Sequence, residues 1–265
     1  MIKRKLLAAI DRARESLRIA PPVPDEAVHD ARKCLKKARA ALRLLRSGLG
    51  EASYRAQNVA LRDAGRCLSP LRDAKSLLDA LEALRRRYAS ELRGVELGRL
   101  QRRLRANHAK ARRELFASPA RLQNCIQLLD DCRRQAEQAD VSRLDCKAFR
   151  SGLRRIYRKG RKAFAEAKPA GTPGALHEWR KQVKYLQYAI EILFPAQKGK
   201  LARLVKRADK LAARLGEDHD LALLSQQTQA MKALQALIQR RRAKLQKRAF
   251  ALGEKLYDKK PGRFP

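Results

Sequence analysis

The sequence predicts an all-α protein, and three observations lead to this fold class. Apolar residues recur with the period of an α-helix along all 265 residues. Ala, Leu, Arg, Lys and Glu, which favour helices, fill long runs, and no stretch alternates β-branched and polar residues as a strand would. Hydrophobic residues make up 45% of the chain, so the helices can bury a sizeable core.

Turn-forming residues delimit the helices of the N-terminal part. Pro21, Pro22 and Pro24 should close the first helix, because proline lacks the backbone N–H that a continuing helix needs. Ser69-Pro70 and Ser118-Pro119 each predict a helix start, with serine as the N-cap and proline at the first helical position.

The later part of the chain contains the clearest interruption of the helical pattern. Residues 169–174 (PAGTPG) predict a linker between an N-terminal half, 1–168, and a C-terminal half, 175–265, which together form one domain. Within the second half, Phe194-Pro195 should end one helix, and Leu215-Gly216-Glu217 should end another.

The charge balance restricts the partners that the protein can have. Lys and Arg number 63 against 27 Asp and Glu, which gives a formal net charge of +36. Self-repulsion of this size opposes a compact fold unless anions share the surface. We therefore expect nucleic acid, an anionic membrane surface or a phosphate polymer as the partner.

The remaining composition predicts a cytoplasmic protein. The five cysteines form an odd set with no CxxC pair, and each lies beside apolar neighbours, as is typical of core residues in a reducing compartment: Cys34, Cys67, Cys125, Cys132 and Cys146. The apolar stretch Leu6–Ile10 is too short for a signal-peptide core. No segment approaches the roughly 18 apolar residues that a membrane span needs.

An internal repeat relates the two halves. The segment His29–Lys36 (HDARKCLK) matches His177–Lys184 (HEWRKQVK) at an offset of 148 residues, 177 − 29. Further on, Leu71–Ala74 matches Asp218–Leu221 at nearly the same offset. Two matches in the same order and at nearly one offset predict a duplication.

The repeated segments carry cations on one helical face and apolar residues on the opposite face. The candidate ligand-binding residues of this charged face are His29, Arg32, Lys33, Lys36, Arg39 and Arg43 in the first copy, and His177, Arg180, Lys181, Lys184 and Tyr188 in the second. Like charges three and four residues apart repel one another, so a bound anion would stabilise this arrangement. The alternative is that each strip is simply the exposed face of a very basic protein.

The residue types of the charged face suit phosphate. Arginine offers a planar fork for two phosphate oxygens, lysine supplies a mobile point charge, and histidine and tyrosine donate hydrogen bonds. Secondary candidates on other helices are Arg154, Arg158 and Arg161 before the linker, and Arg203, Lys206, Arg207 and Lys210 after Pro195. We expect about a third of these to contact the ligand.

The paired H-x-x-R-K-x-x-K helices, together with the segments that end in Arg72-Asp73 and Leu215–Asp220, resemble the CHAD family. The resemblance extends from about Lys3 to the helix ending near Leu256. It implies two four-helix halves related by pseudo-two-fold symmetry around a basic central groove or pore. It also implies that this groove binds inorganic polyphosphate and that the protein can be recruited to polyphosphate granules.

Three positions depart from the family pattern. Gln187 stands where another basic residue is usual, and Glu191 stands where the first half has Arg43, so the second half should bind more weakly. His219 replaces the asparagine that commonly precedes Asp220, which leaves a side chain that can still donate a hydrogen bond.

The motifs that are missing favour a binding protein over an enzyme. The E-x-E-x-K signature of the triphosphate-tunnel enzymes that often adjoin CHAD domains is absent, as are a P-loop and a dinucleotide-binding motif. Four histidines without H-x-x-x-H spacing predict no metal site, and we expect no cofactor. Asp73 and Asp220 are expected to cap helices or orient the cations, and His108 to lie on an exposed helix face.

Three functions remain open at this stage. Polyphosphate binding is favoured, and phosphate or sulfate would be expected in such a site in a crystal. Non-specific binding of nucleic acid is the alternative, although only 5% of residues are aromatic and can stack on bases. An enzyme acting on phosphate chains lacks acidic metal ligands. If His29 and His177 contact phosphate, affinity should fall as pH rises through their bound-state pKa values. The sequence leaves the oligomeric state open.

Overall fold

The protein is described here from a computed structural model, which places residues 1–18, 23–117, 119–196 and 198–264. All regular structure in these ranges is helical, so the predicted all-α class is confirmed. The elements are α1 (Ile2–Leu17), α2 (Asp25–Leu49), α3 (Glu51–Cys67), α4 (Ser69–Arg87), α5 (Gly98–Phe116), α6 (Pro119–Gln138), α7 (Cys146–Ala170), α8 (Pro173–Leu193), α9 (Gly199–Gln227), α10 (Lys232–Leu256) and the short 3-10 helix η1 (Pro261–Arg263).

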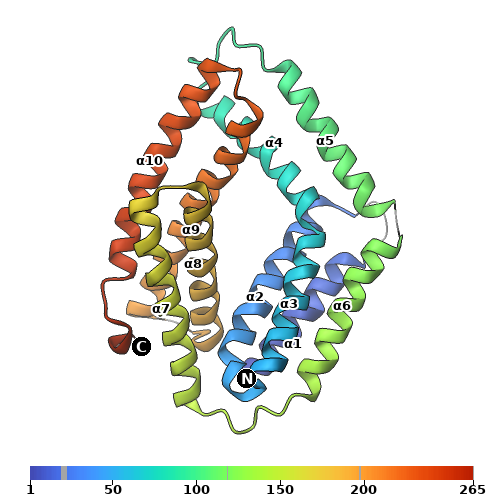
Figure 1. The fold of residues 1–265 in the computed structure, drawn as a ribbon, viewed down its shortest axis with the longest axis vertical. Helices are drawn as coiled ribbons and strands as arrows, with labels where there is room; N and C mark the ends of the chain where they lie inside the picture. Colours follow the sequence, from blue (N-terminus) through green and yellow to red (C-terminus); the bar gives the residue numbers. More distant parts are fainter. Residues whose placement is uncertain (19–22, 118, 197, 265) are drawn as a thin grey trace.

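The helices form two bundles that meet along α2 and α8 (Figure 1). Helices α1, α2, α3 and α6 pack around one another, and α7, α8, α9 and α10 pack in chain order beside them. Helices α4 and α5 leave the first bundle and reach across to the far ends of α9 and α10 (Figure 1). The two helices with the repeated motif, α2 and α8, therefore lie in the middle of the molecule.

Two hydrophobic clusters hold this arrangement together. The larger one joins both bundles and includes the fully buried Leu42, Leu45, Trp179 and Val183. Deleting one such large side chain typically costs about 2–5 kcal/mol, since the core cannot collapse fully around the cavity. The smaller cluster joins the far ends of the two chain halves, with Leu81, Leu84, Leu100 and Leu104 from α4 and α5 packed against Leu221, Leu224, Leu234, Leu237, Ile238 and Leu245 from α9 and α10.

The predicted breaks of the N-terminal part are partly correct. Pro24 lies between α1 and α2 and is the N-cap of α2, whereas Pro21, Pro22 and Ser118 lie outside the described residues. Pro119 begins α6 as expected. The prediction for Ser69 is wrong, because α4 starts at Ser69 itself and the Ser69 hydroxyl caps no backbone N–H. It donates instead to the carbonyl of Gly65 and accepts a hydrogen bond from Arg32.

The predicted linker is shorter in the structure than in the sequence pattern. Pro169 lies inside α7 and Pro173 is the first residue of α8, so only Gly171 and Thr172 separate the helices. Gly171 adopts a left-handed conformation (φ 59°) that favours glycine, and the Thr172 hydroxyl accepts a hydrogen bond from the N–H of Ala175 at 3.3 Å. The division into two halves stays a prediction.

The helix starts follow the spacing of the sequence repeat. Helix α8 begins 148 residues after α2, at Pro173 against Asp25, and α9 begins 148 residues after α3, at Gly199 against Glu51. The copies differ at Leu68, where the first half is interrupted between α3 and α4 while α9 continues without a break. A pseudo-two-fold relation between the halves stays a prediction.

The prediction that a helix ends at Gly216 is wrong. Helix α9 runs on to Gln227, and Gly216 is buried in its middle. A Cβ atom at this position would lie 3.1 Å from both Nε and Nη2 of Arg180. The glycine therefore reflects the close approach of a side chain from α8 rather than a helix end. The predicted stop at Pro195 is confirmed, since α8 ends at Leu193 with Phe194 as its C-cap.

Buried ion pairs join α9 to α10 near this glycine. Arg242 Nε lies 3.1 Å from Asp218 Oδ1, and the two side chains are 12% and 2% exposed. The side-chain amide of Gln246 donates to the same oxygen at 2.9 Å. One residue earlier on each helix, Arg241 donates to Glu217 Oε1 at 2.6 Å. The pairs fix the register between the two helices, because a buried charge left without its partner is costly.

Candidate anion-binding site

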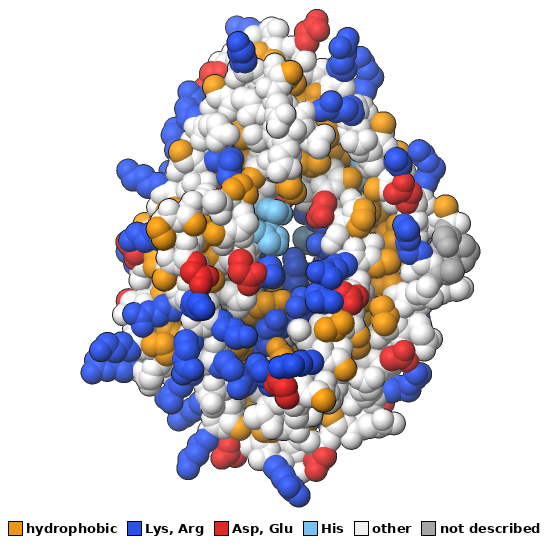
Figure 2. All heavy atoms as spheres, in the orientation of Figure 1, with side chains coloured by type: hydrophobic (Ala, Val, Ile, Leu, Met, Phe, Trp, Pro, Cys, Tyr) orange, Lys and Arg blue, Asp and Glu red, His pale blue; other side chains and the backbone are white. Residues whose placement is uncertain are grey.

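Five cations from three helices converge where the two bundles meet. Arg32 and Lys36 come from α2, Arg72 from α4, and Arg180 and Lys184 from α8; we call this set the central basic cluster. In Figure 2, Lys and Arg side chains gather around a hollow in the middle of one face, with histidines at its edge. The sequence repeat therefore brings its two charged faces to a shared location.

The pKa of Lys36 reflects how close together these positive charges lie. Burial lowers the pKa of Lys36 to about 7, and repulsion from Arg180 and Arg32, then from Lys184 and Arg72, acts in the same direction. A lysine side chain in water titrates near 10.4. At neutral pH Lys36 is therefore only partly protonated, and a nearby anion would restore its charge.

Arg180 is the most deeply placed cation of the cluster. Its burial lowers its pKa, which the carboxylates of Asp220 and Asp73 oppose. Its Nε atom is buried and has no hydrogen-bond partner among the described residues. Buried donors are rarely left unpaired in native proteins, because each costs about 1–3 kcal/mol. An anion bound here would satisfy it.

Neighbouring groups hold the other members in place. Arg32 donates to the carbonyl of Gly65 at 2.7 Å and to the Ser69 hydroxyl. Lys184 donates to Gln187 Oε1 at 3.1 Å and lies 3.4 Å from Asp209 Oδ1. Gln187, which departs from the family pattern, thus positions a cation of the cluster.

A cavity of about 330 Å³ opens next to the cluster, between α4, α8, α9 and α10. Arg180, Lys184 and Arg241 contribute positive charge to its lining, while Asp79, Glu217 and Asp220 contribute negative charge. The absence of a side chain at Gly216 leaves room for Arg180 at this wall. Arg87 of α4 lines it as well, so the cavity carries side chains of both charges.

The two acidic residues singled out by the repeat lie among the cations. The part of the prediction that has them cap helices is wrong, because Asp73 lies beyond the first turn of α4 and Asp220 lies inside α9. Burial raises the pKa of Asp220 to about 6, and the charges of Arg180 and Arg72 oppose this shift. Both carboxylates offset part of the positive charge near Arg180.

Burial lowers the pKa values of the three histidines near the cluster, His29, His177 and His219. The ring of His177 packs against that of His219, with centroids 4.3 Å apart, and His177 Nδ1 is buried without a partner among the placed residues. Burial lowers the pKa of His177 to about 4, and repulsion from His219 and Arg180 adds to this effect. His29 is more exposed, but desolvation of its ring, followed by repulsion from Arg72, still lowers its pKa.

Arg39 and Arg43 continue the basic row of α2 beyond the central cluster. The guanidinium of Arg43 lies 3.7 Å from the centroid of the Tyr185 ring, and that of Arg39 lies at 5.5 Å. Asn58 Oδ1 accepts a hydrogen bond from Arg39 Nε at 3.1 Å. Tyr188 is buried between Lys37 and Lys184, and burial raises its pKa to about 12, so its hydroxyl stays a donor.

The remaining sequence candidates are exposed or already have partners. Lys33 is exposed, and Lys181 pairs with Glu178 one turn earlier on α8. Arg154 donates to the carbonyl of Phe264 at 3.2 Å, and Arg207 donates to that of Lys255, so both contact the C-terminal segment. Like Arg154, five further secondary candidates are exposed: Arg158, Arg161, Arg203, Lys206 and Lys210. Ligand contact by any of these residues stays a prediction.

Sequence reasoning missed Arg72. The residue was part of the matched segment Leu71–Ala74, and it is a cation next to Asp73, but only the fold shows that α4 brings it to α2 and α8. His108 was also misplaced: it is half-buried, and its Nε2 lies 2.9 Å from Asp25 Oδ2. Cys146 is exposed rather than part of the core, while Cys125 and Cys132 are buried as expected.

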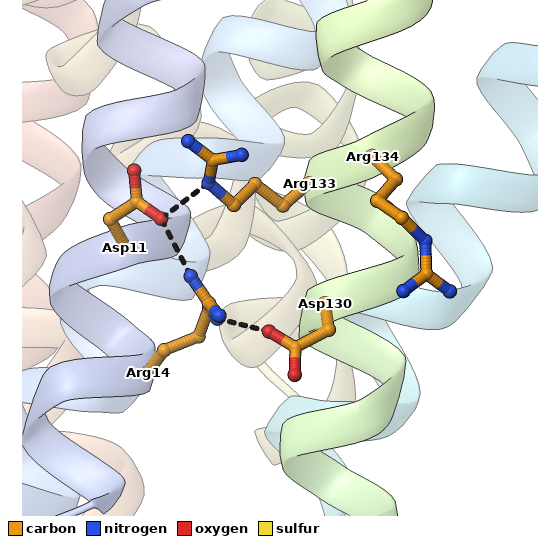
Figure 3. A pocket seen from close by; sticks show the side chains of 5 residues that line it. All are labelled: Asp11, Arg14, Asp130, Arg133 and Arg134. Atoms are coloured by element: carbon orange, nitrogen blue, oxygen red, sulfur yellow. Dashed lines mark hydrogen bonds and ion pairs between the residues drawn. The ribbon is translucent and has the colours of Figure 1, made fainter.

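A second depression, of about 450 Å³ between α1 and α6, is a network of paired charges (Figure 3). Asp11 accepts from Arg14 at 2.9 Å and from Arg133 at 2.8 Å, and Arg14 also pairs with Asp130. Its cations have partners, so it is a weaker candidate than the central cluster.

Within the described residues, no group of three His, Cys, Asp or Glu side chains could hold a metal ion. None of the described helices combines the length and apolar character of a membrane span.

Comparisons with known proteins agree on one family. The family model of the CHAD domain matches residues 2–229. A similar solved structure is that of the CHAD domain from the plant Ricinus communis, with 20% identity, a TM-score of 0.61, and coverage of 97% of this chain and 89% of that one. No curated protein sequence matches. The likeness of structure supports the helical fold, and the family model, which covers most of the chain, shows that this protein belongs to the CHAD domain family.

Proposed function

We propose that the protein binds inorganic polyphosphate along the central basic cluster and catalyses no reaction on it. The observation that supports this most is the buried Arg180 Nε, which has no partner among the residues that the structure places and lies within a group of five cations from three helices. The positive charges of such a group repel one another, and a ligand with several negative charges stabilises them. A chain of phosphates can contact several members at once, so each contact after the first is effectively intramolecular.

Burial favours a thin chain over nucleic acid as the ligand. Lys36 and Arg180 are largely buried, and the cavity that Arg180 lines holds only about 330 Å³. A polyphosphate chain carries its charge on a backbone without bases and can reach such groups. A duplex presents its phosphates on a wide surface, so it would reach mainly the exposed cations. Because we propose polyphosphate as the ligand, we also propose a cytoplasmic location with recruitment to polyphosphate granules.

Polyphosphate is expected to outcompete nucleic acid for the site. In the experiment, labelled polyphosphate is bound to the protein at near-physiological salt, and unlabelled polyphosphate, duplex DNA or RNA is added at matched phosphate concentration. Unlabelled polyphosphate should displace the label at concentrations at least tenfold lower than either nucleic acid, because only the thin chain reaches the half-buried cations. Displacement is followed by fluorescence anisotropy.

Equal displacement by all three competitors would show that net charge alone drives binding, and the nucleic-acid alternative would then be preferred. The competition should be repeated at two salt concentrations. Contacts to exposed cations are screened more strongly than contacts to half-buried ones, so the preference for polyphosphate should widen as salt rises.

Polyphosphate affinity is expected to fall as pH rises above 7. Free Lys36 has a pKa of about 7, and a bound phosphate raises this value because it favours the charged form. Binding therefore takes up a proton between the free-state and the bound-state pKa, and the affinity loses up to about tenfold per pH unit in this window. The pKa values of His29 and His177 are lowered, so any proton that these histidines take up on binding would affect the affinity from a lower pH upward.

Calorimetric titrations from pH 6 to pH 9 in buffers of different ionisation enthalpy measure both the affinity and the protons taken up. The matched variant is Lys36→Arg, which keeps the charge at all these pH values. It should bind with a flatter pH profile above pH 7. If the variant and the unchanged protein lose affinity in parallel, Lys36 is not the group that titrates.

A further inference from the structure

A second group of cations lies where α7 packs against the C-terminal part of α2. Arg155 and Lys159 come from α7, and Arg43 and Arg46 come from α2; we call these four the lateral cluster. Arg155 Nη2 lies 3.5 Å from the carbonyl oxygen of Arg43. The two helices are in close contact here, since a Cβ on Gly152 would lie 3.3 Å from Leu44 Cα. Nothing in the repeated motif predicts the α7 members.

The lateral cluster has little negative charge to balance it. Glu51 is the carboxylate that acts on both Arg155 and Lys159, and it already pairs with Arg46 at 2.7 Å and with Arg55 at 2.6 Å. Neither Arg155 nor Lys159 forms an ion pair within the described ranges. Burial followed by repulsion from neighbouring arginines lowers the pKa of both residues. The cluster therefore resembles the central one in carrying more positive than negative charge.

A continuous row of cations connects the two clusters along α2. Its members are Arg32, Lys36, Arg39, Arg43 and Arg46, which recur at intervals of three and four residues on one side of the helix. At about 1.5 Å per residue, the row extends roughly 21 Å from its first member to its last. A linear ligand that lies along α2 thus meets positive charge over this whole length.

Tyrosine rings order the arginines of the row. The Arg43 guanidinium lies over Tyr185 at 3.7 Å, and that of Arg46 lies over Tyr54 at 4.7 Å. An arginine that is already held against a ring loses less conformational freedom when it binds phosphate than one that is free in water. The stacked arrangement still leaves guanidinium N–H groups available, since the fork has five donors.

We infer that the lateral cluster is a second binding segment for the anionic chain, so that the protein selects chains long enough to extend from the central cluster to α7. This inference rests on the proposed function, because it uses the same ligand. It adds a specificity for length, with Arg155 and Lys159 as the residues that distinguish long chains from short ones. A short phosphate chain would fill only the central cluster.

The double variant Arg155→Gln and Lys159→Gln tests the inference. Affinities for tripolyphosphate and for long-chain polyphosphate are measured by calorimetry. The ratio of the two affinities is then compared between the variant and the unchanged protein. A long chain binds more tightly to any site simply because it can bind in many equivalent registers, and this advantage cancels in the comparison. The variant should bind long chains roughly ten- to hundredfold more weakly, while its affinity for tripolyphosphate changes by less than about twofold.

The matched control is Lys147→Gln and Arg150→Gln, which removes the same charge from exposed positions elsewhere on α7. Its ratio of affinities should equal that of the unchanged protein. An equal loss in both double variants, or an unchanged ratio in the Arg155 and Lys159 variant, would overturn the inference and leave the proposed function intact. Failure of the unchanged protein to bind either phosphate chain would instead overturn the proposed function itself.

Discussion

A fourfold alanine variant of the central basic cluster is expected to bind polyphosphate at least about a thousandfold more weakly. It replaces every member of the cluster except Arg72, namely Arg32, Lys36, Arg180 and Lys184. A hydrogen bond to a charged group contributes roughly 1.5–3 kcal/mol, and a tenfold change in affinity corresponds to about 1.4 kcal/mol. Even if these contributions add only in part, the binding free energy lost with four such groups exceeds about 4 kcal/mol. The slope of log affinity against log salt should also become shallower, because fewer counterions are released per complex.

The matched control variant removes four exposed arginines of α4 and α5, which also lowers the net charge by four: Arg86, Arg99, Arg102 and Arg105. It should lose less than about tenfold in affinity, since these side chains contribute only to the overall field. Filter binding with labelled polyphosphate over a range of salt concentrations measures both proteins. Comparable losses in the two variants would remove the central cluster from its proposed role, and circular dichroism would establish that both remain helical.

Asp218→Ala is expected to cause the largest loss of stability, about 3–5 kcal/mol in the free energy of unfolding. The Asp218 carboxylate is buried between α9 and α10, where it accepts hydrogen bonds from Arg242 at 3.1 Å and Gln246 at 2.9 Å. Its removal leaves the Arg242 charge, 12% exposed, without its partner. Urea unfolding at equilibrium, followed by the helical signal in circular dichroism, measures the loss.

Glu254→Ala serves as the control for Asp218→Ala, because it breaks an ion pair at the surface. Glu254 pairs with Lys168 at 2.8 Å, and both side chains are more than half exposed, at 56% and 54%. Exposed pairs contribute roughly 0–1 kcal/mol, so this variant should unfold within about 1 kcal/mol of the unchanged protein. If the two variants were equally stable, the Asp218 pair would hold no structural role at the junction of α9 and α10.

Helical periodicity was sufficient to predict which residues share a face. His29, Arg32 and Lys36 recur at spacings of three and four, and any helix turns them to one side, whatever it packs against. The apolar stripe opposite these cations then has to face the core, as Ala31 and Leu35 do in the structure. The all-α class and the charged faces of α2 and α8 could therefore be predicted from local spacing alone.

Packing between distant segments could not be predicted in this way. Gly216 suggests a helix end when only its neighbours are considered, because glycine is common at such ends. The reason for this glycine is Arg180, 36 positions earlier in the chain, whose guanidinium lies against it. The pKa of Lys36 depends on Arg72 and Arg180 from two other helices, so its unusual value has no local signature either.

The smaller hydrophobic cluster has a consequence for the way the chain can be divided. It is formed by leucines that precede the Gly171–Thr172 corner and by leucines that follow it, such as Leu84 and Leu100 against Leu224 and Leu234. Each stretch of chain thus completes the interior of the other, and the two are interlocked rather than merely adjacent. A fragment that stops at the corner would present these leucines to water, so the basic helices α2 and α8 reach their shared location only when the entire polypeptide folds as a unit.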